Sequence, residues 1–221
     1  MSIAKVRRIK PINGYSSKTP DNLLLDAGAF FKNFEVGKDT YASAKASGKC
    51  LGVTIKGGEF SAKPSFRNME FDGVKNRVKG GVFIDSWEVS IKASLAEATT
   101  DNFMLALGVA DVDKESVAGY EKITGRNYLI DSDFAENITW VGCLLGEDEP
   151  CIIQIFNGLN ESGMTMAFAD KDNAKNEVQF FGYNDDSVYD DLEKEVLPPF
   201  AIYRPVTTSA ETTDETTEQE A

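Results

Sequence analysis

The sequence predicts a mostly β protein, whose antiparallel strands form a sandwich or barrel-like body with one short helix on its flank. Apolar and polar residues alternate with a period of two over residues 51–97. Two later pairs of apolar runs are joined by polar turns, and one window alone has a helical period. With 221 residues, of which 42% are hydrophobic, the chain is large enough to bury a core.

Residues 51–97 predict three successive strands. In the first, Leu51, Val53 and Ile55 alternate with polar or small residues, and the glycine pair at 57–58 ends it. Phe60, Met69 and Phe71 then belong to a strand pair, and Asp72-Gly73 is a turn signal. The longest run, 82–97, places one apolar set on a single face: Trp87, Val89, Ile91, Ala93 and Leu95. We therefore expect Trp87 and Leu95 to point into the core of a half-buried strand.

The period becomes helical at about 99–108. Thr99 or Thr100 can cap the helix, and Gly108 can end it. Phe103, Met104 and Leu107 share its apolar face. Residues 111–133 are polar and irregular, so we expect a long loop there, with a short strand near 128–130.

Two hairpins follow. The first pairs about 137–145 with 151–157, and the second pairs about 164–169 with 177–183 around a turn at 170–176. An extended segment begins at Leu197, and the β domain is expected to cover residues 23–205. Residues 1–22 would form an N-terminal arm. Residues 206–221 are acidic and Thr-rich without aromatic residues, which predicts a disordered tail.

The composition excludes several classes of function. A net charge of −13 and a pI near 4.5 disfavour a protein that binds nucleic acid through a basic face, because such proteins neutralise phosphates with Lys and Arg. The chain has no histidine, which removes the commonest general base and a common zinc and iron ligand. Its three cysteines, Cys50, Cys143 and Cys151, have neither disulfide-framework nor CxxC spacing.

The first ten residues are basic, but residues 11–21 are polar and turn-rich where a signal peptide needs an apolar stretch. No apolar run approaches the roughly 20 residues that span a bilayer. We expect a protein that is made in the cytoplasm and has no membrane partner.

Other local signals have simpler structural explanations. Asp170, Asp172 and Glu177 lack the glycine of a calcium loop. Residues 119–126 have two glycines and Lys122 but lack the Gly-Lys-Ser/Thr ending and the strand-to-helix context of a phosphate-binding loop. The acidic pairs and triplets lie in turns, where water screens them. Trp87 and Trp140 lie in apolar runs and are expected to pack. We therefore predict no catalytic, cofactor-binding or metal-ligating residue and no enzymatic activity.

Several short motifs follow one another over residues 23–108: Leu23-Leu24-Leu25-Asp26-Ala27-Gly28-Ala29, Leu51-Gly52, the glycine pair before Glu59-Phe60, Pro64, Arg67, Phe71-Asp72-Gly73, Lys79-Gly80 and Leu95-Ala96-Glu97. The order of these motifs resembles that of the tail tube, or major tail, proteins of long-tailed bacteriophages. The resemblance implies a tail tube β fold with hexameric rings that stack into a conduit for the genome. It implies contacts with tail terminator, tape-measure and baseplate or tip proteins, passage of DNA without specific binding, and residence in the virion tail after assembly in the host cytoplasm. The alternative is a soluble β-sandwich module that binds a carbohydrate or protein.

Two sets of residues are candidates for such an assembly. Residues 30–49 carry Phe30, Phe31, Phe34 and Tyr41 among polar residues, which favours an inter-subunit arm whose aromatic rings need a partner surface. A loop covering its own core is the alternative. A second set would line the lumen with carboxylates, with Lys63 and Lys92 as a minority: Glu59, Glu70, Asp72 and Glu88. The same residues could instead lie on the solvated outside of a sandwich.

Overall fold

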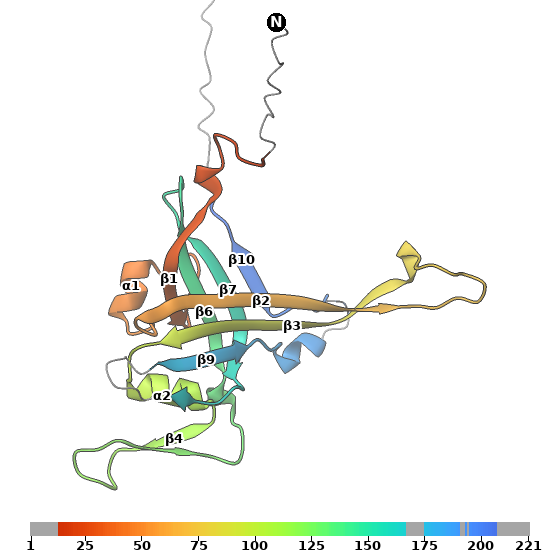
Figure 1. Cartoon of the computed structure of the whole chain (residues 1–221). Helices are drawn as coiled ribbons and strands as arrows, with labels where there is room; N and C mark the ends of the chain where they lie inside the picture. The colour runs from red at the N-terminus through yellow and green to blue at the C-terminus, as the bar shows by residue number, and fades with distance from the viewer. Residues whose placement is uncertain (1–12, 167–174, 191–192, 194, 207–221) are drawn as a thin grey trace, which may run out of the picture.

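A computed structural model of the chain describes residues 13–166, 175–190, 193 and 195–206 (Figure 1). The protein is mostly β, with antiparallel pairing throughout the described strands. The strands are β1 (Leu24–Lys32), β2 (Thr54–Asn68), β3 (Val82–Leu95), β4 (Ala110–Asp113), β5 (Lys122–Gly125), β6 (Ala135–Leu144), β7 (Cys151–Asn160), β8 (Thr165–Met166), β9 (Asn176–Phe181) and β10 (Phe200–Tyr203). The α-helices are α1 (Tyr41–Ala46) and α2 (Thr100–Leu107).

β7 joins two layers of the main sheet. Along its first half it pairs with β6 on one side and β10 on the other, and β6 pairs with β1. Near its end, Leu159 and Asn160 pair with β9, which continues through β3 to β2. The strands β1, β6, β7 and β10 cross the direction of β2, β3 and β9 (Figure 1). The predicted β-sandwich class is confirmed in this open form, which is not a closed barrel.

The main core lies between these layers. Val89, Ile91, Ala93 and Leu95 of β3 are buried, so the predicted inward face of this strand is confirmed for them. They pack with Phe30, Ile138, Ile155, Val178 and Phe180 from the other strands and with Ala106 from α2. Trp87 differs, because its side chain is 36% exposed. It lies where β3 leaves the body, so only part of its surface finds neighbours.

The helix predicted at 99–108 is α2. The Thr99 hydroxyl accepts a hydrogen bond from Asn102 N, and Gly108 follows the helix with φ +75°. Asn102 Nδ2 also donates to the carbonyls of Leu51 and Glu97, both at 3.0 Å, which ties α2 to the start of β2 and the end of β3. The sequence prediction of a single helix missed α1, because its six residues bury only Ala44 and show no apolar stripe.

Two predictions about strands within residues 51–97 are wrong. The glycine pair at 57–58 does not end a strand, because β2 continues through it across an irregularity in its register with β3. A Cβ on Gly58 would lie 2.3 Å from both Phe30 Cζ and the Lys92 carbonyl oxygen, so glycine there makes room for the buried ring. Residues 69–71 lie beyond β2 and are not in a strand, whereas Asp72-Gly73 forms the predicted turn.

The long loop predicted at 111–133 instead contains the hairpin of β4 and β5, and residues 128–130 form no strand. Arg126 holds the end of this segment through ion pairs with Asp111 at 2.9 Å and with Asp133. The hairpin of β6 and β7 is confirmed. In the second predicted hairpin β8 pairs with β9, while most of its turn, including Asp170 and Asp172, lies outside the described residues.

Within the part of the chain that the structure describes, neither helix has the length and apolarity required to cross a bilayer. Residues 13–22 of the expected N-terminal arm contain a 3-10 turn at Pro20–Asn22. Residues 1–12 and nearly all of the expected C-terminal tail lie outside the described residues.

Candidate assembly surface

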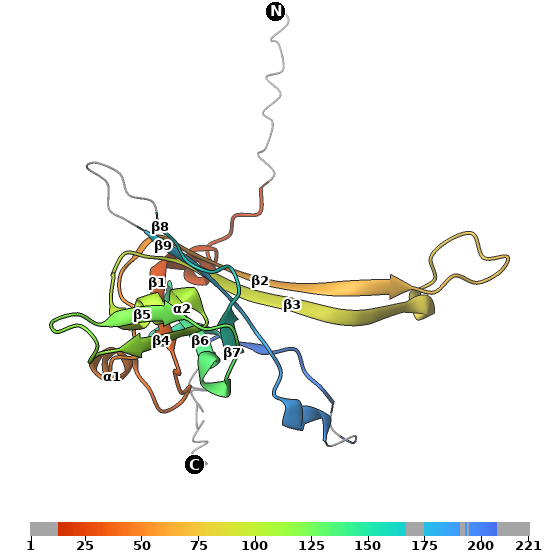
Figure 2. The ribbon, with the colours of Figure 1, turned by 90° about the horizontal axis from the view of Figure 1, so that it is seen from below.

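The distal half of the β2–β3 hairpin projects from the body, together with the loop that joins the strands (Figures 1 and 2). We call residues 66–84 the distal arm. The register places Phe66 opposite Ile84, Arg67 opposite Phe83 and Asn68 opposite Val82. β3 has no buried side chain before Val89, so the distal arm lies outside the core.

The distal arm carries an unusual amount of exposed apolar surface. Eight large hydrophobic side chains are between 39% and 57% exposed: Phe66, Met69, Phe71, Val74, Val78, Val82, Phe83 and Ile84. Phe66 and Ile84 share one face of the hairpin, and Phe83 lies on the other. Exposed apolar side chains concentrated on one projecting element mark a protein interface or another binding surface.

Aromatic rings hold the root of the arm. The ring of Phe200 on β10 lies 5.7 Å, between centroids, from both Phe60 of β2 and Trp87 of β3. Tilted aromatic pairs at this separation are each worth about 0.5–1.5 kcal/mol beyond the area they bury. The arm therefore leaves the body in a direction defined by packing against β10.

The tip of the arm has its own structure. Met69 N donates to the Gly81 carbonyl at 2.8 Å, which closes the loop, and Gly81 is buried beneath Phe71 and Val78. The arm is also basic in an acidic protein. Arg67, Lys75, Arg77 and Lys79 outnumber Glu70 and Asp72, for a net charge of +2 against −13 for the whole chain.

The four expected lumen residues do not form one acidic face. Glu59 and Glu88 lie on the same face of the hairpin, but Glu59 is opposite Lys92 and Glu88 is opposite Lys63. These four paired residues are two acids and two lysines, so the expectation that lysines form a minority is wrong for this face of the hairpin. Glu70 and Asp72 are exposed in the loop at the tip, away from the sheet face.

The expectation that the aromatic rings of residues 30–49 need a partner is also wrong for three of the four. Phe30, Phe31 and Phe34 are at most 2% exposed within a single subunit, whereas Tyr41 is 50% exposed. Phe31 packs against Phe34 and Tyr41, with centroids 5.5 and 5.8 Å away. The alternative, a segment that covers its own core, is correct here. Phe30 packs in the main core, and Phe31 and Phe34 pack with Ala44 of α1 and Val141 of β6.

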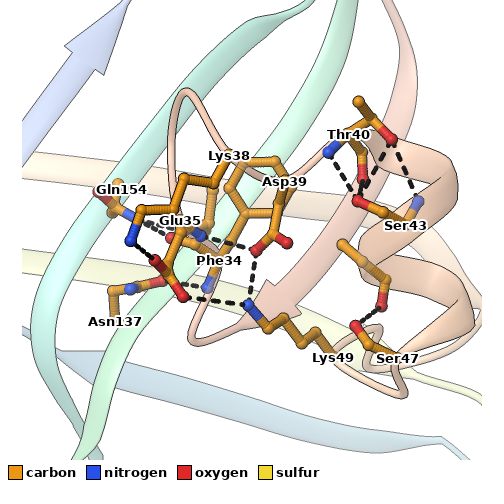
Figure 3. Close-up of polar contacts among 12 residues, drawn as sticks. Phe34, Glu35, Lys38, Asp39, Thr40, Ser43, Ser47, Lys49, Asn137 and Gln154 are labelled. Carbon is orange, nitrogen blue, oxygen red and sulfur yellow. Dashed lines mark hydrogen bonds and ion pairs between the residues drawn. The ribbon is translucent and has the colours of Figure 1, made fainter.

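Buried amides fasten this segment to the sheet (Figure 3). Phe34 N donates to Asn137 Oδ1 at 2.9 Å, and Gln154 Nε2 donates to the Phe34 carbonyl at 2.8 Å and to Thr139 Oγ1 at 2.9 Å. The Thr139 hydroxyl donates in turn to Asn137 Oδ1. Asn137 of β6 and Gln154 of β7 thus satisfy both backbone groups of Phe34, and Thr139 links these two side chains.

Ion pairs join side chains of residues 35–49 at the surface near this network (Figure 3). Glu35 accepts from Lys38 Nζ at 2.6 Å, and Asp39 accepts from Lys49 Nζ at 2.6 Å. The Lys38 hydrogen bond lowers the pKa of Glu35 below its ordinary value. The pKa of Asp39 is also below its ordinary value. The largest cause is the hydrogen bond from the backbone N–H of Glu35, and the next is the hydrogen bond from Lys49. Both carboxylates are therefore favoured in the charged form that holds the segment closed.

Comparisons with known protein families and with curated proteins found no match. Among the described residues, no three His, Cys, Asp or Glu side chains lie close enough to hold a metal ion. The feature that most needs a functional explanation is therefore the exposed apolar arm.

Proposed function

We propose that this chain is the structural subunit of a bacteriophage tail tube, which assembles into stacked hexameric rings and has no catalytic role. The observation that carries the proposal is the distal arm, whose apolar side chains lie outside the subunit's own core. The motif order over residues 23–108 supports the same family. In this function the tube forms in the host cytoplasm, meets terminator, tape-measure and baseplate or tip proteins at its ends, and lets DNA pass without specific binding.

The apolar surface of the arm is large enough to supply most of a standard interface. Covering about half of eight large side chains would remove on the order of 600 Å² from water, compared with roughly 800 Å² per partner in a standard interface. At about 25 cal/mol per Å² this is about 15 kcal/mol before the cost of association, which is about 4–15 kcal/mol. Further contacts between bodies would then decide the net affinity.

A second copy of the chain is a suitable partner. The arm and the surface that receives it would be different parts of the same molecule, so each copy could use both at once. Contacts of this head-to-tail kind generate rings when the rotation closes and filaments when it does not. The long edge of β2, which pairs with no further strand among the described residues, is a second reason, since association covers an edge that would otherwise invite aggregation.

The test is sedimentation velocity with negative-stain microscopy of the purified protein. We expect rings or tubes for the natural sequence and dispersed, folded subunits for Phe83→Asp with Ile84→Asp. A matched control, Val117→Asp with Tyr120→Asp, changes two exposed apolar residues in the β4–β5 turn and should still assemble. A natural sequence that stays monomeric at all concentrations, with binding to a sugar or peptide, would support the alternative binding module.

A further inference from the structure

The connection between β9 and β10 is the most acidic projecting segment of the described body. Its described residues, 184–190, 193 and 195–197, contain Asp185, Asp186, Asp190, Glu193 and Glu195 without a lysine or arginine, for a net charge of −5. The segment also exposes apolar side chains. Tyr189 is 61% exposed, Leu197 65% and Val196 38%.

Both ends of this segment are fixed to the body. Gly182 N donates to the Val89 carbonyl, and Tyr183 N donates to the Phe156 carbonyl, both at 3.0 Å. At the other end Phe200 begins β10. Between them, the Asp185 carboxylate accepts from Ser187 N at 2.9 Å and caps the 3-10 turn Asp186–Tyr189. In Figure 2 this turn stands out from the body. The side chains of Asp186, Tyr189 and Asp190 are exposed and therefore open to a partner.

The distal arm has the complementary properties. It carries a net charge of +2 with eight exposed apolar side chains, where the 184–197 segment carries −5 with three. The tip of the arm lies far from this segment of the same copy in both views (Figures 1 and 2). A contact between the tip and the segment therefore requires two copies.

We propose that the basic tip of the distal arm in one copy docks on the acidic 184–197 segment of the next copy. This rests on the proposed function, and it names the two surfaces that meet when the chain assembles. Apolar side chains on both surfaces supply the burial, while the opposite charges set register and partner choice. The hairpin of β4 and β5 is a weaker acceptor because two of its four acids already form ion pairs within the chain: Asp111 with Arg126, and Glu121 with Lys114.

Two charge-reversal variants test the pairing. The tip variant is Lys75→Glu, Arg77→Glu, Lys79→Glu, and the segment variant is Asp186→Lys, Asp190→Lys, Glu195→Lys. Asp185 is left unchanged because it caps the 3-10 turn. Each variant alone places like charges in the contact, so we expect the concentration required for assembly to rise at least tenfold at low salt. In an equimolar mixture every tip meets a segment of opposite charge, so the rings should form again with alternating subunits.

The controls separate this inference from the proposed function. Lys18→Glu, Lys45→Glu, Lys56→Glu changes the net charge as the tip variant does, at exposed residues outside both surfaces, and should assemble normally. Failure of the mixture to assemble, while the natural sequence and this control do, would overturn the docking pair and leave the tube function standing. Normal assembly of the tip variant on its own, without the segment variant, would also overturn the proposed docking pair. A natural sequence that never assembles would overturn both.

Discussion

Replacing Gln154 by leucine removes the amide that fastens residues 34–49 to the sheet while nearly preserving side-chain volume. Gln154 is 4% exposed, and its Nε2 donates to the Phe34 carbonyl and to the Thr139 hydroxyl. Leaving a buried acceptor without its donor costs about 1–3 kcal/mol. At about 2 kcal/mol, the melting temperature of a domain of this size would fall by about 4–8 °C.

The assay is urea unfolding together with hydrogen exchange of backbone amides. We expect exchange to accelerate over residues 34–49 more than over the strands β3 and β9, because the lost bond holds the segment and not the main core. Gln179→Leu is the matched control, since the Gln179 amide is half-buried and donates to Ser90 Oγ at a longer 3.3 Å. A loss below about 0.5 kcal/mol for Gln154→Leu, or equal effects of the two changes, would refute the role assigned to this network.

Three further outcomes are expected. Leu95→Ala should cost about 2–5 kcal/mol in urea unfolding, because Leu95 is 1% exposed, and an unchanged midpoint would contradict its place in the core. Gly58→Ala should destabilise the fold and alter Phe30 side-chain resonances, since the new methyl group would overlap that ring; unchanged spectra would contradict the close approach. The folded pKa values of Glu35 and Asp39 are lowered, so their contribution is present above the ordinary carboxylate pKa of about 4 and is lost as the pH falls through the folded values. Exchange of residues 34–49 should accelerate in that acidic range, and protection that does not change would contradict it.

Several elements could be predicted from the sequence because local chemistry specifies them. The period-two pattern places Val89, Ile91 and Leu95 on one face of a strand in any β fold that buries that face. Thr99 and Gly108 mark the ends of α2 because the first and last turns of a helix need side-chain or backbone partners close by. The turn between β6 and β7 follows from polar residues between two apolar runs.

The candidate assembly surface depended on long-range packing. Residues 82–84 are apolar and continue the pattern of β3, so in the sequence they cannot be told from core residues, yet β3 extends beyond the layer that covers its inner face. Phe30, Phe31 and Phe34 show the converse. Their polar neighbours favoured an exposed arm, but Phe30 packs in the main core, and β6 and α1 help to enclose Phe31 and Phe34. Local pattern determined which side chains share a face, whereas the tertiary structure alone decided whether another layer lies against that face, because burial depends on segments distant in the chain.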